Sequence, residues 1–130
     1  MRLFILGGAL AALLAGCAAA LGVTLTASGF TAVHYAAQAP LALNGLHNPS
    51  SSRLSALSID ATCWEAGYPS LATRFHAGPV SIDAGATLSA VTLPYASGYP
   101  SFTGGAVSCS FQVANNGPPG EPSTVWLEVP

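Results

Sequence analysis

Few side chains in this 130-residue sequence could carry chemistry, and they lie far apart. The histidines are His34, in an apolar stretch, and His47 and His76, in loop-like sequences. No HExxH motif or close pair of histidines occurs, so no zinc site is indicated. The sequence also lacks the GxSxG turn of hydrolases and the glycine-rich loops that bind phosphates or dinucleotides. We therefore expect a protein that is not an enzyme and that binds no metal or cofactor.

The composition is apolar and nearly free of charge. Hydrophobic residues make up 51% of the chain and charged residues 6%, against about 25% in an average soluble domain. Lysine is absent, and no charged residue occurs between Leu3 and Ser52. Binding to nucleic acid or to an anionic membrane surface needs clustered basic side chains, so both are excluded. The apolar content also excludes disorder, and the length indicates one domain.

The N-terminal region has the pattern of an export signal. Arg2 is followed by the apolar run Leu3 to Leu14 and then by Leu14, Ala15, Gly16 and Cys17. These last four residues resemble the lipobox of bacterial lipoproteins, in which the cysteine is acylated and becomes the new N-terminus. The resemblance implies a signal segment at 1–16, a lipid anchor on Cys17, and a location in the bacterial cell envelope, facing the periplasm or on the outer membrane.

Two other interpretations of the N-terminus remain open. Residues 3–26 are long and apolar enough for an uncleaved transmembrane helix. Ala18, Ala19 and Ala20 also fit ordinary signal-peptidase cleavage, which would release a secreted protein. All three interpretations place the chain beyond about residue 28 outside the cytoplasm.

Cys63 and Cys109 are predicted to form a disulfide. They remain as an even pair once Cys17 is set aside, and an extracytoplasmic compartment is oxidising. Each lies in phase with apolar residues of a strand-like alternation, so both thiols are expected to point inward. We expect their Cα atoms to be about 4.4 to 6.8 Å apart. Neither cysteine has a CxxC partner or a histidine near it in sequence, which argues against metal binding.

Alternation with a period of two recurs along the chain and indicates a mostly β fold. The candidate strands are Val23 to Ala27, Thr31 to Ala36, Leu54 to Trp64, Leu71 to Phe75, Val80 to Asp83, Thr87 to Leu93, Ala106 to Ala114 and Thr124 to Val129. Residues 43–52, 76–79 and 115–122 are expected to be turns or loops. The pattern predicts an antiparallel, immunoglobulin-like β-sandwich behind an N-terminal apolar helix.

The expected organisation has three parts. After the signal segment, residues 17–52 form an uncharged apolar segment with the tether and the first strands, and residues 53–130 form the main β domain. Trp64 directly follows Cys63, whereas immunoglobulin domains place a tryptophan about a dozen residues after their first cysteine. The prediction therefore covers the architecture and not the immunoglobulin family.

A short repeat carries the one candidate binding surface. Residues 66–73 (AGYPSLAT) and 97–104 (SGYPSFTG) place Tyr68 and Tyr99 alike, with Trp64 and Tyr95 upstream. The repeat fits turn chemistry, since proline fixes φ and glycine permits positive φ. It also fits exposed aromatics on rigid loops, which bind sugars, peptides or proteins. We expect Tyr68 and Tyr99 to lie at the same end of the domain, with Trp64 or Tyr95 beside them.

These observations predict a non-enzymatic, membrane-tethered protein outside the cytoplasm that is a structural or accessory component of an envelope assembly. One alternative is a ligand-binding module that holds carbohydrate or peptide through the aromatic loops. Another is a single-helix accessory subunit of a larger membrane complex. The low charge favours an assembled protein over a free one, because a free domain relies on a charged surface for its solubility.

Overall fold

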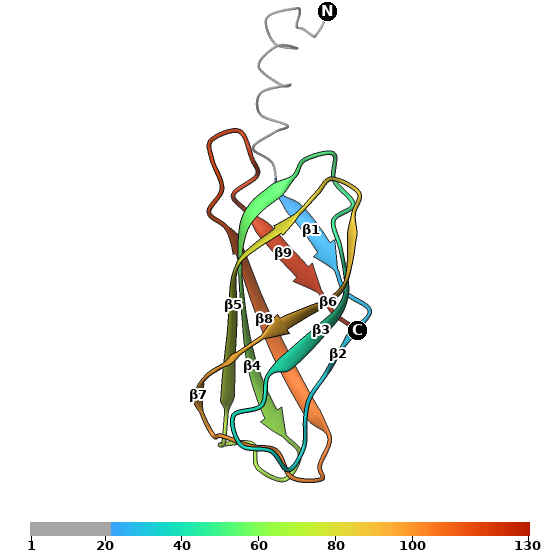
Figure 1. The fold of residues 1–130 in the computed structure, drawn as a ribbon. Helices are drawn as coiled ribbons and strands as arrows, with labels where there is room; N and C mark the ends of the chain where they lie inside the picture. Colours follow the sequence, from blue (N-terminus) through green and yellow to red (C-terminus); the bar gives the residue numbers. More distant parts are fainter. Residues whose placement is uncertain (1–21) are drawn as a thin grey trace, which may run out of the picture.

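The computed structural model describes residues 22–130, and these form nine strands (Figure 1). The strands are β1 (Val23–Thr26), β2 (Gly29–Thr31), β3 (Leu41–His47), β4 (Leu54–Glu65), β5 (Thr73–Ile82), β6 (Thr87–Leu93), β7 (Tyr95–Gly98), β8 (Val107–Asn115) and β9 (Val125–Glu128). Cys17 and most of the expected N-terminal helix lie outside the described residues, but Val23–Thr26, the end of the 3–26 helix considered as an anchor, form strand β1 instead. Between residues 22 and 130 no helix is long and apolar enough to span a membrane.

The strands form two sheets. The first sheet has the strand order β2-β3-β1-β9, and β6 also pairs with β3. The second has the order β7-β5-β4-β8. Among these nine strands, all pairings are antiparallel except that of β1 with β9, which run parallel from Val23 opposite Val125 to Thr26 opposite Glu128. The first strands of the chain therefore share a sheet with the last one.

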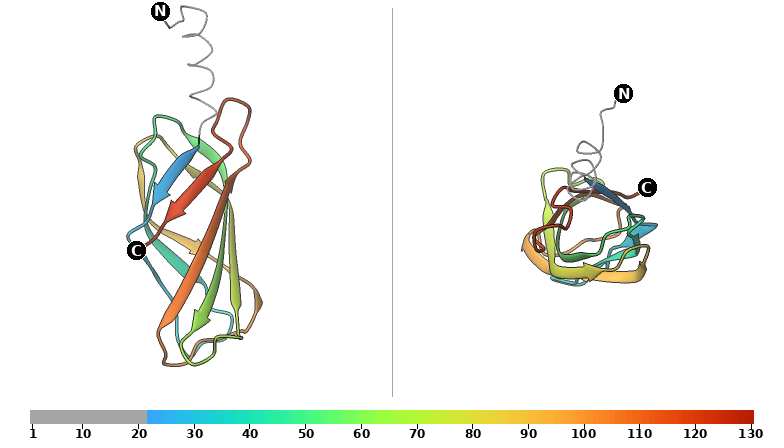
Figure 2. Two further views of the ribbon diagram at one scale, coloured as in Figure 1. Left: turned by 180° about the vertical axis from the view of Figure 1, so that it is seen from behind. Right: turned by 90° about the horizontal axis from the view of Figure 1, so that it is seen from above.

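The two sheets bury a common core, as expected from the alternation of apolar and polar residues. Both sheets contribute fully buried side chains, such as Leu43 from the first and Ile59 from the second. Seen along the long axis of the molecule, the strands surround this shared interior (Figure 2). Burial of each such side chain stabilises the fold by about 1.5–3 kcal/mol. The predicted mostly β fold is confirmed.

Strand β5 corrects one prediction. Residues 76–79 were expected to form a turn between two short strands, but they lie within β5. The register with β4 shifts there, so that Gly78 and Pro79 oppose the single residue Ser58. A β-bulge of this kind accommodates proline, which has no N–H to donate to the sheet. The turn-forming residues therefore bend the strand without ending it.

Two predictions for the first sheet were also wrong. Residues 43–47 were expected in a loop but belong to β3, where the Asn44 side chain donates a hydrogen bond to Thr31 on β2. Gly45 has a φ of 65° within this strand, and a Cβ there would lie 2.7 Å from Ser28 Oγ. Residues 32–36 were expected in a strand, but β2 ends at Thr31. Strand β7 was not predicted.

Candidate functional site

The two ends of the molecule are built from different loops. Residues 32–40, 66–72 and 99–106 lie at the end where β4 finishes, at the bottom of Figure 1. The loops at 48–53, 83–86 and 116–124 lie at the other end, together with Gly22. Strand β4 has 12 residues, so the two ends are separated by about 40 Å.

A small pocket lies at the end remote from Gly22. We call it the tyrosine pocket, and its lining residues are Glu65, Tyr68, Leu71, Tyr99, Ser101, Phe102 and Thr103. Its volume is about 60 Å³. Tyr68 is 49% exposed and Tyr99 is 43% exposed. The structure therefore brings the two tyrosines of the sequence repeat together at one end, with both rings accessible.

A glycine with positive φ and a backbone hydrogen bond position each of the two tyrosines. The preceding glycines, Gly67 and Gly98, have φ values of 93° and 91°, which favour glycine. The Tyr68 N–H donates to the Glu65 carbonyl at 3.0 Å, and the Tyr99 N–H donates to the Ala72 carbonyl at 2.8 Å. The repeat thus forms a tight turn before Tyr68 and the end of strand β7 before Tyr99, and both copies present an exposed ring.

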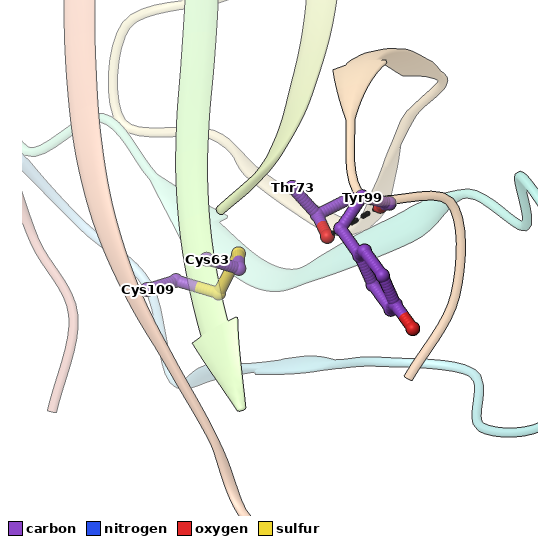
Figure 3. Close-up of a disulfide and its surroundings, with 4 residues drawn as sticks. All are labelled: Cys63, Thr73, Tyr99 and Cys109. Atoms are coloured by element: carbon purple, nitrogen blue, oxygen red, sulfur yellow. Dashed lines mark hydrogen bonds between the residues drawn. A yellow bond between two sulfur atoms is a disulfide. The ribbon is translucent and has the colours of Figure 1, made fainter. Parts of the chain in front are cut away.

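A row of paired residues across the second sheet is linked to the pocket through Tyr99. Cys109, Cys63, Thr73 and Gly98 lie opposite one another on successive strands. The predicted disulfide between Cys63 and Cys109 is confirmed, and the Thr73 hydroxyl donates to the Tyr99 carbonyl at 2.6 Å (Figure 3). The two cysteine Cα atoms are 4.1 Å apart, slightly closer than expected, because the residues face each other directly across one ladder.

Glu65 forms part of the pocket wall and is only 6% exposed. Its Oε1 accepts the Thr103 N–H at 2.7 Å, and its Oε2 accepts the Thr103 hydroxyl and the Gly105 N–H, both at 2.6 Å. The hydrogen bond from the Thr103 hydroxyl is the largest of the effects that hold the pKa of Glu65 below its ordinary value. The backbone N–H groups of Thr103 and Gly105 add to it, as does positive charge on His34, while burial opposes it. The carboxylate is therefore ionised at neutral pH.

Phe102 and the loop at 32–40 complete this end of the molecule. Phe102 is 4% exposed, and its ring centroid lies 6.3 Å from that of Phe75 and 6.2 Å from that of His34. The Tyr35 N–H donates to the Phe102 carbonyl at 2.7 Å, while the Tyr35 side chain is 79% exposed. Tyr35 thus adds a third exposed tyrosine to this end.

The other two aromatics of the predicted surface do not line the tyrosine pocket. Trp64 precedes Glu65 on β4, pairs with Ser108 and is half-buried. Tyr95 lies in β7, where its ring packs edge-on against Phe75 and its hydroxyl donates to the Gly98 carbonyl at 2.6 Å. Tyr95 therefore holds the end of β7, directly before Tyr99, from within the sheet.

Sequence analysis did not single out Glu65, Phe102 or Tyr35. A signal for Glu65 was present, because it continues the inward phase of Ile59, Ala61 and Cys63 along β4. A carboxylate on an otherwise apolar face is unusual and marks a buried charge. Tyr35 and Phe102 are brought together by pairing between distant loops, and no local pattern indicates this.

Four of the other titratable groups form two exposed pairs. Arg53 lies 3.4 Å from Asp83, and His76 Nδ1 lies 2.8 Å from Asp60 Oδ1. Exposed pairs of this kind contribute about 0–1 kcal/mol to stability. In residues 22–130 no three histidine, cysteine or acidic side chains gather as a metal site would require.

Comparison with protein-family models, with curated proteins and with solved structures finds no match. The function must therefore be inferred from the geometry of the chain itself.

Because the pKa values of Glu65 and Glu121 are both lowered, we expect the stability of the fold to fall in acid. The pKa of Glu121, at the end near Gly22, is also lowered, chiefly by a hydrogen bond from the Asn115 side chain and then by the Ser55 N–H. A carboxyl whose pKa is lower in the folded state stabilises the fold above its unfolded value of about 4.3, and this stabilisation is lost as the pH falls through the folded value. We expect the melting temperature to decline progressively below about pH 4.5.

Variants identify the groups responsible for this decline. Glu65→Gln and Glu121→Gln should each lower the melting temperature at pH 7 and flatten its dependence on pH below about 4.5. The matched control is Glu128→Gln, because Glu128 is an exposed glutamate on β9. Thermal unfolding followed by circular dichroism from pH 7 to pH 3 gives these slopes. A slope unchanged in both variants would contradict the assignment.

Proposed function

We propose that this protein is a non-enzymatic, extracytoplasmic domain, tethered to the membrane through its N-terminal region, that contacts another component of a cell-envelope assembly through the tyrosine pocket. The observation that carries the proposal is the position of two exposed tyrosines around one pocket at the end remote from Gly22. A tether attached before Gly22 would hold this pocket about 40 Å from the membrane side of the domain.

The disulfide supports a location outside the cytoplasm, because such bonds form and persist in oxidising compartments. The lipobox-like residues Leu14 to Cys17 support lipidation as the means of attachment. Both arguments agree with the export signal at the N-terminus.

We also assign an immunoglobulin-like sandwich architecture to residues 22–130. Support comes from the two sheets with a shared core and from Greek-key-like pairings such as that of β4 with β8. Immunoglobulin domains of antibodies join their two sheets by a disulfide, whereas Cys63 and Cys109 lie on neighbouring strands of one sheet. The assignment is therefore to the architecture alone.

A second candidate function is a ligand-binding module for carbohydrate or peptide. The exposed rings of Tyr68 and Tyr99 favour it, because rigid aromatic side chains on loops suit stacking against a ligand. The two functions use the same surface and differ in what occupies it.

The function is tested with a photocrosslinking amino acid at Tyr35, which lies at the same end of the domain as the tyrosine pocket but does not line it. In cells expressing the full chain, we expect a discrete protein adduct that disappears when Tyr68→Ala and Tyr99→Ala are combined, with melting temperature and membrane retention unchanged. Aromatic residues that become well packed at the centre of an interface can contribute about 2 kcal/mol to binding, which corresponds to about thirtyfold in affinity.

Two further variants serve as controls for this experiment. The crosslinker at Trp126, which is 56% exposed on β9 and outside the pocket, should give no such adduct. Cys17→Ser should release the chain from the membrane fraction. An adduct that persists in the double tyrosine variant would exclude the pocket as the contact, and unchanged retention of Cys17→Ser would exclude a lipid anchor.

A further inference from the structure

Glu65 is a buried carboxylate that forms no ion pair within residues 22–130, although His34 lies near enough to lower its pKa. The ion pairs formed within residues 22–130 are Arg53 with Asp83 and Asp60 with His76, and neither involves Glu65. His34, the basic side chain of the neighbouring loop, bonds instead to the Gly105 carbonyl at 3.2 Å. Buried charges in proteins are ordinarily paired, so this one leaves a negative potential in the wall of the pocket.

The hydrogen-bond arrangement leaves room for one more donor. A carboxylate offers about four acceptor positions. Three are used by Thr103 and Gly105, two of them on Oε2 and one on Oε1. A ligand with an N–H group that enters the pocket can therefore donate to Oε1 of Glu65.

The remaining walls of the pocket also favour a cation. Three of its seven lining residues, Tyr68, Tyr99 and Phe102, are aromatic. The faces of aromatic rings carry partial negative charge and attract ammonium groups. An anion would be repelled by Glu65, and a volume of about 60 Å³ admits a headgroup of a few non-hydrogen atoms but not a whole sugar ring.

We propose that the tyrosine pocket binds a primary alkylammonium group, such as the end of a lysine side chain presented by the partner. The proposal rests on the proposed function, because it names the chemistry that the contact recognises. The ammonium donates one N–H to Glu65 Oε1, and its alkyl stem lies against the rings of Tyr68 and Tyr99. The chain itself has no lysine, so this ligand comes from another molecule.

The probe is n-butylammonium, which has the charge and length of a lysine side chain, and its neutral counterpart is n-butanol. Titration of the full-length protein in detergent, followed by the NMR signals of the tyrosine rings, gives both affinities. We expect n-butylammonium to bind about tenfold more tightly than n-butanol. Equal binding of the two would overturn the proposal. Tighter binding of tetramethylammonium would overturn the primary-amine assignment, because that ion has no N–H to donate.

Variants link the binding to the pocket. Glu65→Gln should reduce the preference for the charged probe to nearly none, but it also disturbs the loop that Glu65 holds. Tyr68→Leu leaves that loop intact and should weaken n-butylammonium about fivefold, whereas Tyr35→Leu, outside the pocket, should leave its affinity unchanged. Unchanged affinity in Tyr68→Leu would contradict the proposal.

The two proposals fail in different ways. If n-butylammonium does not bind while the double tyrosine variant still loses its crosslinked adduct, the ammonium assignment is wrong and the proposed function stands. If n-butylammonium binds while the adduct is independent of the tyrosines, the pocket has a ligand but is not the contact with the partner.

Discussion

Reduction of the disulfide between Cys63 and Cys109 is expected to lower the free energy of unfolding by about 4 kcal/mol. The bond joins residues 46 apart in sequence, and closing a loop of this length removes that much conformational entropy from the unfolded chain. Natural domains are stable by about 5–15 kcal/mol, so a large fraction of the total is at stake. The corresponding fall in melting temperature is about 20 °C.

Urea unfolding of the full chain with and without reductant measures this loss. The double variant Cys63→Ala with Cys109→Ala should be destabilised at least as much as the reduced protein and should not respond to reductant. The double variant also removes the sulfur atoms, and Cys63 is fully buried. The difference in unfolding free energy between the double variant and the reduced protein therefore measures the loss of packing, apart from the loss of the cross-link. Cys17→Ser is the matched control and should leave the unfolding midpoint unchanged. Equal midpoints with and without reductant would refute the prediction.

Asn48→Ala is expected to lower the free energy of unfolding by about 2–4 kcal/mol. Asn48 is fully buried, and its amide donates to the carbonyls of Ser52 at 2.8 Å and Asp83 at 3.2 Å. Its Oδ1 accepts from both the N–H and the hydroxyl of Ser50. All four hydrogen-bonding positions of the side chain are therefore used, and its removal leaves partly buried polar groups of Ser50 and Ser52 without these partners.

Asn48→Asp gives a sharper test of the same network. A carboxylate at this position would face the carbonyl oxygens of Ser52 and Asp83, which raises its pKa above the ordinary value of about 3.9. A carboxyl with a raised pKa in the folded state destabilises the fold at high pH and ceases to do so once it is protonated. The stability gap between Asn48→Asp and the parent should thus narrow as the pH falls below about 5.

The control for this variant is Asn116→Asp, which introduces the same charge at an exposed asparagine. It should follow the parent protein closely at every pH. Equilibrium unfolding in urea at several pH values gives both curves. A constant gap for Asn48→Asp would show that the two carbonyls do not face the introduced carboxylate.

Much of the second sheet could be predicted from the sequence. The alternation along β4 and β8 gave both strands to within a residue or two, and the inward phase of Cys63 and Cys109 led to the disulfide. Residues with turn propensity caused the errors elsewhere. Gly78 and Pro79 occupy a bulge within β5, and Asn44 and Gly45 lie within β3. Local propensity indicates a change of direction, but only pairing with a neighbouring strand decides whether the strand ends there.

The part of the candidate site that depends on local sequence was predictable, whereas the part that depends on contacts between distant residues was not. The repeat predicted similar positions for Tyr68 and Tyr99, and the structure brings both to one pocket, although Tyr68 follows a turn and Tyr99 follows strand β7. The role of Glu65 depends on donors 38 and 40 residues away in sequence, and Tyr35 reaches this end through pairing with Phe102. Such contacts are set by the packing of loops from different sheets, which a single sequence does not reveal.

The parallel pairing of β1 with β9 determines how the domain responds to mechanical force. With the proposed attachment before Gly22 and the proposed partner contact at the tyrosine pocket, the domain would be pulled along its long axis, and the load would enter at Val23. Because the four residue pairs from Val23 with Val125 to Thr26 with Glu128 lie along β1, that load acts on their hydrogen bonds together, in shear, instead of opening them one at a time. Under the proposed attachment, strand β1 is therefore arranged to resist extraction from the sheet.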